Sequence, residues 1–243
     1  MKMNKKTIIL CGLAILVIVT LLIASADSFF GWFGPKTLVV GNESDYKSIQ
    51  QAIDAARDGD TIKVTASLSP YSGNLHINKS IKLVGENRNN TIIDGGGEGT
   101  CIYVTADNVH ICNFTVQNGA WGIHIESSSK CVLKRNNMVN NTFYGLRVEG
   151  KYDNNIDQSN TINGKLIYYL HDIHGSSENP KIIENNELLG SIILGNCTHI
   201  IVRNNTIYNG DGIQLMDSFN NILKGNKLVN TLTPHHFREY INP

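Results

Sequence analysis

The chain has 243 residues, of which 41% are hydrophobic and 17% are charged, and its 21 basic residues balance its 21 acidic ones. A chain without net charge has no long-range field that would draw it to nucleic acid, so we expect no nucleic-acid partner. About 30 residues are asparagine. That residue suits tight turns between strands, because it tolerates a left-handed backbone and bonds to neighbouring backbone groups.

The first 26 residues are typical of an export segment. Lys2, Lys5 and Lys6 precede an apolar run, Thr7 to Ala26, which ends in Ala24-Ser25-Ala26. The run is long enough to span a bilayer, and its small final residues match a cleavage site. Residues 1–26 are therefore predicted to be either a signal anchor or a cleaved signal peptide. In both cases the remainder is exported, as a single-pass cell-membrane protein with its folded part outside or as a secreted protein.

Residues 27–37 follow as an aromatic, glycine-rich juxtamembrane linker. The next segment, Ser44 to Asp60, carries apolar residues at helical spacing and ends near Gly59, which predicts one helix. We expect this helix to cover the open apolar end of the strand stack that follows. In an exported chain the Asn-x-Ser/Thr sequons at Asn42 and Asn78 are candidate glycosylation sites, because both lie outside the asparagine-rich repeat.

A repeat of roughly 22 residues runs through the second half of the chain. Each copy places an apolar residue two positions after an asparagine, or after a phenylalanine in the first copy. The pairs are Phe114/Val116, Asn137/Val139, Asn160/Ile162, Asn186/Leu188, Asn205/Ile207 and Asn226/Leu228. This period, with strand-like alternation, predicts an all-β right-handed parallel β-helix of about seven coils over residues 38–230, followed by a tail or cap over 231–243. Stacked asparagines are expected to bond from coil to coil.

Three residue runs carry a resemblance to a known group: DYKSIQQAIDAARDGDTIKV, SIKLVGENRNNTIIDGGG and VHICNFTVQNGAWGIHI. They resemble the start of right-handed parallel β-helix proteins of the pectin-lyase-like superfamily, and more closely the archaeal and bacterial NosD-like proteins. The resemblance covers most of the exported part and implies the fold. It does not imply one activity, because members are variously named as copper-binding, carbohydrate-binding or surface proteins. The catalytic signatures of the superfamily's esterases, polygalacturonases and lyases have no counterpart here.

A second repeated pattern predicts a row of exposed side chains. The segments Gly122-Ile-His-Ile, Gly145-Leu-Arg-Val and Gly212-Ile-Gln-Leu share the repeat period. If their apolar residues point inward, the residues between them point outward and stack from coil to coil. The predicted ligand-binding stripe consists of Trp121, His124, Glu126, Tyr144, Arg147, Glu149, Tyr168 and Gln214. Such a stripe is either a sugar-binding wall or an ordinary solvated sheet face.

One irregular segment, Lys165 to Pro180, interrupts the repeat and contains His171 and His174. Imidazoles suit copper and zinc, so these two residues are candidate metal ligands. The alternative is a solvent-exposed loop that happens to hold two histidines. We expect the segment to project at one edge of the stripe, because insertions into a solenoid cost little loop-closure entropy.

Three functions remain open from the sequence. The first is a non-enzymatic surface protein that binds polysaccharide or glycan, or serves a structural role in the envelope. The second is a polysaccharide-active hydrolase or lyase, for which Glu126 and Glu149 are spaced closely enough to flank a glycosidic bond. The third, implied by the NosD-like resemblance, is a periplasmic copper-handling accessory protein. We expect no cofactor, and we expect the exported cysteines Cys101, Cys112, Cys131 and Cys197 to stay unpaired, since solenoid interiors accept cysteine as a small apolar residue.

Overall fold

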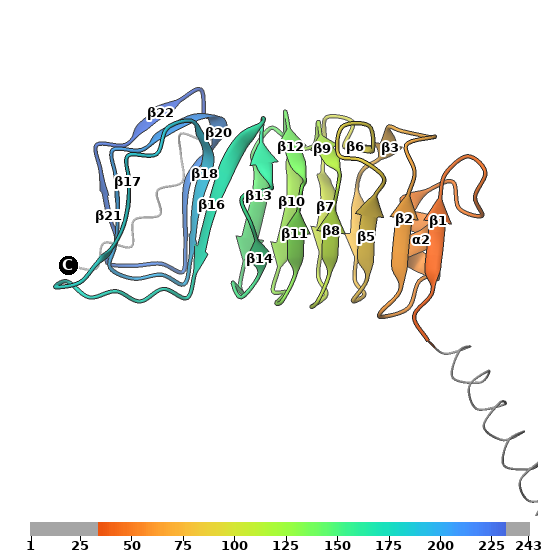
Figure 1. The fold of residues 1–243 in the computed structure, drawn as a ribbon, viewed down its shortest axis with the longest axis horizontal. Coiled ribbons are helices and arrows are strands. Elements are labelled where there is room, and N and C mark those ends of the chain that lie inside the picture. The colour runs from red at the N-terminus through yellow and green to blue at the C-terminus, as the bar shows by residue number, and fades with distance from the viewer. Residues whose placement is uncertain (1–33, 232–243) are drawn as a thin grey trace, which may run out of the picture. The chain divides into compact units, whose positions relative to one another are not determined.

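The computed structural model describes residues 34–231 of the chain. The chain divides into residues 1–36 and a compact unit, Thr37–Pro243, and the fold described here is that of the second unit (Figure 1). The predicted export segment, most of the linker and almost all of the predicted tail lie outside the described residues. Within residues 34–231, no helix is both long enough and apolar enough to cross a bilayer.

The fold is a right-handed parallel β-helix, as the repeat predicts. In its first part the central coils each contribute one short strand to each of three sheets. The six-stranded sheet contains β1 (Thr37–Val40), β2 (Thr61–Val64), β5 (Lys82–Gly85), β8 (His110–Cys112), β11 (Val132–Lys134) and β14 (Asn155–Ile156). The four-stranded sheet contains β4 (Leu75–Ile77), β7 (Thr100–Val104), β10 (Trp121–Glu126) and β13 (Tyr144–Glu149).

The third sheet has nine strands and continues into the second part of the fold. It contains β3 (Tyr71–Ser72), β6 (Ile92–Asp94), β9 (Thr115–Gln117), β12 (Asn137–Val139), β15 (Thr161–Ile162), β16 (Lys165–His171), β18 (Leu189–Gly195), β20 (Thr206–Met216) and β22 (Lys227–Val229). A three-stranded sheet, β17 (Lys181–Glu184), β19 (Ile200–Arg203) and β21 (Ile222–Lys224), completes the later coils. The solenoid has about nine turns, rather than about seven, because the first coils form without the asparagine repeat used to count them.

Apolar ladders fill the interior of the first part. In the six-stranded sheet, Ile62 pairs with Leu83, Leu83 with Ile111 and Ile111 with Leu133, and all of these side chains are fully buried. Stacked strands lie about 4.8 Å apart, so each side chain packs on those of the coils above and below it. Burial of each such side chain stabilises the fold by about 1.5–3 kcal/mol.

An asparagine ladder runs beside the apolar ones, as expected. The Oδ1 atom of Asn160 accepts hydrogen bonds from the backbone N–H and the Nδ2 of Asn136 at 3.1 and 3.0 Å. Later coils repeat the arrangement through Asn186, Asn205 and Asn226. Other asparagines occupy the expected left-handed turn positions, for example Asn113 with φ 66°.

The repeat pairs are predicted to form the interior ladder, and this is wrong by one residue at two positions. Leu188 is 54% exposed while its neighbour Leu189 is buried, and the pair Asn137/Val139 is displaced in the other direction. Asn136 and Met138 are fully buried, whereas Asn137 and Val139 are only half-buried. The sequence offers two adjacent asparagines at this point, and a shift of one residue exchanges the two faces of a strand.

The predicted helix over Ser44–Asp60 is much shorter in the structure: α2 spans Ile49–Ala55. Tyr46 forms a bridge to Val40 of β1, and Ser48, with φ −124° and ψ 139°, is still extended, so the helix begins only at Ile49. The helix lies beside β4, where the Gln50 side chain accepts a hydrogen bond from the backbone N–H of His76 at 2.9 Å. At its other end the Lys79 ammonium donates to the carbonyls of Ile53, Asp54 and Ala56, which would otherwise lack intrahelical partners.

A two-residue hairpin ends the first part. β15 and β16 pair antiparallel across Asn163-Gly164, whose φ angles of 49° and 75° place both central residues in the left-handed region. Asn-Gly favours this type I′ geometry, which reverses the chain in two residues. In Figure 1 the coils of the first part are seen from the side, whereas those of the second part outline a rectangle, so the coil axis turns after the hairpin. The regular single stack predicted up to Asn230 is therefore divided into two parts.

The strands β16 and β18 form a wall between the two cores. Ile167 and Ile193 pack into the core of the first part, while Ile192 and Leu194 belong to the core of the second part. Every residue of β18 is buried, as expected for a strand with no solvent face. Lys165–His171, predicted to be the start of a projecting loop, is the first strand of this wall.

Side chains from β20 close the exposed edge of β13, the last strand of the four-stranded sheet. The Asp211 carboxylate accepts hydrogen bonds from the backbone N–H groups of Gly145 at 2.8 Å and Leu146 at 3.0 Å. The Gln214 amide donates to the Leu146 carbonyl at 3.1 Å. Together they satisfy backbone groups that another strand would otherwise pair.

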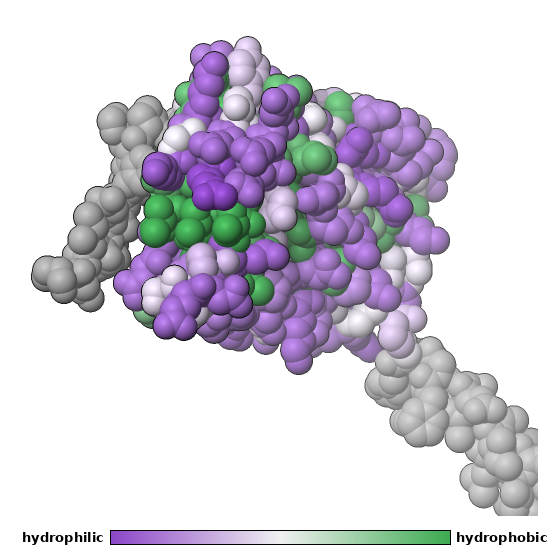
Figure 2. Space-filling view, turned by 60° about the vertical axis from the view of Figure 1, so that its left-hand side comes forward, coloured by the Kyte–Doolittle hydropathy of each residue, from purple (hydrophilic) through white to green (hydrophobic). Residues whose placement is uncertain are grey.

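The last described coil exposes apolar side chains at the far end of the second part. Ile222 of β21 is 54% exposed and Leu228 of β22 is 39% exposed. Figure 2 turns this end of Figure 1 toward the viewer and shows an apolar strip between polar surfaces. Leu228 pairs with the buried Ile207 of the preceding coil, so it is the last inward-facing residue of that ladder within residues 34–231. Ile222 pairs with Ile201 and lies on the outer face of its sheet, because the neighbouring Val202 and Leu223 face the core.

Candidate functional site

The outer face of the four-stranded sheet carries aromatic, histidine and charged side chains that lie in register on neighbouring strands. Strand register places His124 between Tyr103 and Arg147, and Tyr103 beside His76. The same register pairs Trp121 with Tyr144 and Glu126 with Glu149. We call this surface the aromatic platform; it comprises His76, Tyr103, Trp121, His124, Glu126, Tyr144, Arg147 and Glu149.

Six of these residues were predicted from the repeated Gly-apolar-polar-apolar pattern, and the structure brings them together. His76 and Tyr103 were missed. The segments Leu75-His76-Ile77 and Ile102-Tyr103-Val104 carry the same alternation of apolar and polar residues, and this signal could have placed both side chains in the row.

The rings of the platform contact one another in sequence. His76 stacks on Tyr103 with centroids 5.2 Å apart, and Tyr103 lies 5.4 Å from His124. Trp121 meets the His124 ring edge-to-face at 4.4 Å. The His124 imidazole is thereby held between two rings and is only 6% exposed, so its orientation is set by packing.

The backbones of two neighbouring coils approach each other closely at this sheet, and the lack of a side chain at Gly122 allows this approach. A side chain at Gly122 would place its Cβ 2.5 Å from the Gly145 carbonyl oxygen of the next coil. Glycine at the start of the repeated pattern is therefore a packing requirement, which brings Trp121 and Tyr144 onto adjacent strands.

Polar contacts organise the other end of the platform. Arg147 donates two hydrogen bonds to Oε1 of Glu149, at 2.9 and 2.5 Å. The second oxygen of Glu149 lies 3.1 Å from His124 Nε2. Glu126 accepts a hydrogen bond from the Tyr103 hydroxyl, and the Arg147 guanidinium also lies over the Tyr144 ring at 5.0 Å.

These contacts set the protonation of the site. Burial lowers the pKa of His124 below its ordinary value, against the opposing effect of its hydrogen bond to Glu149, so the imidazole is neutral at neutral pH. Burial would raise the pKa of Glu149, but the Arg147 contacts outweigh it and the net pKa is lowered. The hydrogen bond to Glu126 raises the pKa of Tyr103, so the phenol keeps its proton.

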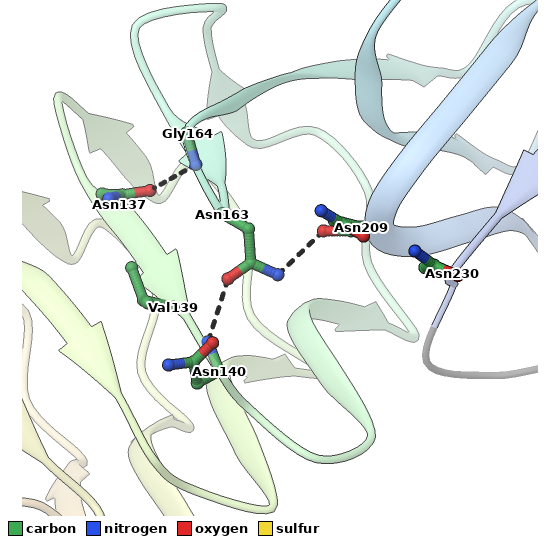
Figure 3. A pocket seen from close by; sticks show the side chains of 7 residues that line it. All are labelled: Asn137, Val139, Asn140, Asn163, Gly164, Asn209 and Asn230. Carbon is green, nitrogen blue, oxygen red and sulfur yellow. Dashed lines mark hydrogen bonds between the residues drawn. The ribbon is translucent and has the colours of Figure 1, made fainter.

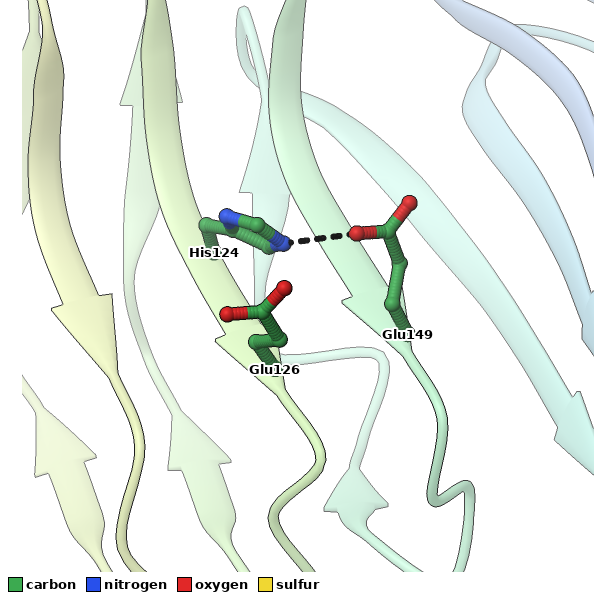
Figure 4. Close-up of side chains that lie close together, drawn as sticks. All are labelled: His124, Glu126 and Glu149. Carbon is green, nitrogen blue, oxygen red and sulfur yellow. Dashed lines mark hydrogen bonds and ion pairs between the residues drawn. The ribbon is translucent and has the colours of Figure 1, made fainter.

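The platform also holds the only group of three or more potential metal ligands found together in residues 34–231. The ligand atoms of His124, Glu126 and Glu149 all lie within 4.8 Å of one another. Figure 4 shows the imidazole and the two carboxylates converging from the neighbouring strands β10 and β13.

Two residues predicted for the stripe lie elsewhere. Tyr168 is in β16 and Gln214 in β20, both in the nine-stranded sheet. Tyr168 packs against the core of the second part, and Gln214 is 4% exposed. The repeat equates Gly212-Ile-Gln-Leu with Gly122-Ile-His-Ile, but the hairpin at Asn163-Gly164 moves the later coils into a different sheet.

The predicted metal ligands and glycosylation sites lie outside the platform, and their side chains are at least partly exposed. The Nδ1 of His171 lies 2.9 Å from Asp172, and the Nδ1 of His174 lies 3.4 Å from the Thr198 hydroxyl. Metal binding by this pair stays a prediction. Asn42 and Asn78 are both exposed, and their glycosylation stays a prediction as well. Cys101, Cys112, Cys131 and Cys197 are free.

A concave surface, separate from the platform, lies where the two parts of the solenoid meet. It has a volume of about 580 Å³ and is lined by Asn137, Val139, Asn140, Asn163, Gly164, Asn209 and Asn230. Figure 3 shows Asn163 at its centre, where its Oδ1 accepts from the Asn140 N–H and its Nδ2 donates to the Asn209 carbonyl. The amides are thus partly used in holding the two parts together.

Stacked parallel coils, with a row of rings and charged groups on the outer face of one sheet, define a parallel β-helix protein. The chain belongs to the right-handed β-helix family, because the family model described as a right handed beta helix region matches residues 100–232, more than half of its length. Comparisons with curated proteins and with solved structures found no match.

Proposed function

We propose that this chain is an exported, membrane-tethered or secreted β-helix protein of the cell surface that binds polysaccharide or glycan on the aromatic platform. The observation that carries the proposal is the partly exposed Trp121, which lies beside His124 and Tyr144 on the sheet face that also holds Arg147 and the two glutamates. Aromatic rings pack on the apolar faces of sugars, while carboxylates and guanidinium groups bond to the hydroxyls.

Non-catalytic binding fits the electrostatics better than hydrolysis. Glu126 and Glu149 face each other on adjacent strands, a separation that would suit a retaining glycosidase. A general acid needs a raised pKa, whereas the pKa of Glu149 is lowered, so Glu149 does not fit the general-acid role, and its carboxylate is already bonded to Arg147. A purely structural envelope role would leave the rings of the platform without a ligand. The NosD-like resemblance, with its copper-handling relatives, supports a third candidate that involves His171 and His174.

A glycan array with the purified protein tests the proposal. We expect Trp121→Ala to weaken binding at least about tenfold, since truncating an anchoring aromatic side chain commonly costs more than 1 kcal/mol. Phe219→Ala is the matched control, because Phe219 is an aromatic residue 53% exposed that lies outside the platform. Glu126→Gln should retain binding. Release of reducing ends or unsaturated products that stops in the glutamate variants would instead identify an enzyme, and equal binding by the Trp121 and Phe219 variants would refute the platform.

A further inference from the structure

We propose that His124, Glu126 and Glu149 form a binding site for a divalent transition-metal ion of the zinc type. The site differs from the predicted His171/His174 pair, which lies outside the platform. It does not rest on glycan binding, since the three ligands would hold the ion whether or not a sugar is present.

The geometry already approaches that of a coordination sphere. Zinc bonds of about 2.0–2.2 Å to nitrogen and oxygen place neighbouring ligand atoms about 3–3.5 Å apart. His124 Nε2 and Glu149 Oε2 lie 3.1 Å apart, within this range. The Glu126 carboxylate stays within 4.8 Å of both, and a small side-chain rotation would complete a three-ligand set.

The ligands are positioned by the contacts around them. Tyr103 and Trp121 pack against the two sides of the His124 ring. Arg147 engages Oε1 of Glu149 and leaves Oε2 directed at the histidine, while the Tyr103 hydroxyl holds Glu126. Hydrogen bonds of this kind orient ligands in known metal centres, and their loss commonly costs 10–100-fold in metal affinity.

The donor set decides which ions fit. One imidazole nitrogen and two carboxylates suit zinc and its first-row neighbours, whereas calcium and magnesium prefer oxygen ligands alone. Two carboxylates opposed by one guanidinium leave a net negative charge, which attracts a divalent cation. Glu126 and Glu149 are only half-buried, so water can occupy the positions that the protein does not fill, as in open zinc sites.

Calorimetric titration of the full-length protein with zinc chloride alone tests the proposal. We expect one tight site, with weaker binding of manganese and no comparable binding of calcium. Glu126→Gln and His124→Gln should each lower the zinc affinity at least about tenfold, a loss of ~1.4 kcal/mol. Glu126→Gln is the safer variant because its side chain is partly exposed, and circular dichroism verifies that each variant is folded.

Three control variants separate this site from other zinc ligands. His110→Gln removes a histidine from the six-stranded sheet, and Glu184→Gln removes a carboxylate from an exposed ion pair with Arg203. The double variant His171→Gln/His174→Gln removes the histidine pair predicted as metal ligands outside the platform. All three should bind zinc as the unaltered protein does. The proposal is overturned if no tight zinc site exists, if the platform variants bind zinc normally, if a control variant abolishes the site, or if calcium binds as tightly as zinc.

Discussion

The asparagine ladder offers a direct test of how the coils are held together. Asn136 is fully buried; its Oδ1 accepts from the Phe114 N–H at 3.2 Å, and its Nδ2 donates to the Ile111 carbonyl at 2.9 Å. Asn136→Ala removes the side-chain amide that bonds to the Phe114 N–H and to the Ile111 carbonyl. A buried polar group left unsatisfied costs about 1–3 kcal/mol, so the two together predict a loss of about 2–6 kcal/mol. That is a large fraction of the ~5–15 kcal/mol that stabilises a typical domain.

The adjacent residue supplies the control. Asn137 is half-buried, and its Oδ1 accepts from the Thr161 hydroxyl and the exposed Gly164 N–H, groups that water can reach. Asn137→Ala should therefore cost less than about 1 kcal/mol. Urea denaturation followed by circular dichroism measures both variants, with a midpoint shift of roughly 1–2 M expected for Asn136→Ala. Equal losses, or a greater loss for Asn137→Ala, would refute the assignment of Asn136 to the interior.

Two further predictions concern the junction between the two parts of the solenoid. Gly164→Ala should destabilise the protein by about 1 kcal/mol in the same urea assay, because Gly164 has φ 75°, a backbone conformation that costs energy for alanine. The added Cβ would meet no atom within 4 Å, so the loss would come from the backbone alone. An unchanged midpoint would contradict the I′ turn. Burial raises the pKa of Asp211 from its ordinary 3.8 to about 7, against the two backbone N–H groups that donate to it. The folded state then binds the Asp211 proton more tightly than the unfolded state does. The stabilisation that this gives, up to about 4 kcal/mol in the free energy of unfolding, is fully present below about pH 4 and is lost as the pH rises to about 7. Asp211→Asn, which does not titrate, should flatten this part of the pH–stability profile, and an unaltered slope would count against a protonated Asp211.

Several features of the platform could be predicted because they depend on local rules alone. Strand side chains alternate with a period of two, and parallel coils repeat at a fixed spacing. These rules were enough to place His124 beside Arg147 and Glu126 beside Glu149. They failed at Asn136-Asn137, where the repeat permits two registers and only the burial of Met138 distinguishes them.

The change of direction at Asn163-Gly164 was also encoded locally, since Asn-Gly between apolar runs is a strong hairpin signal. Its consequence was not local. Once the chain reverses, Gly212-Ile-Gln-Leu joins the nine-stranded sheet, and Gln214 turns from an expected surface residue into a buried partner of Leu146.

The amino-acid sequence by itself determined the parallel β-helix, its asparagine ladder and most of the exposed platform, because each follows from the alternation and period of nearby residues. Only the tertiary structure decided that the solenoid has two parts, that Asp211 closes the edge of β13, and that His124, Glu126 and Glu149 bring their ligand atoms together. The first two depend on how coils distant in sequence pack against each other. The third depends on side-chain rotamers fixed by Tyr103, Trp121 and Arg147, and no sequence period specifies either kind of contact.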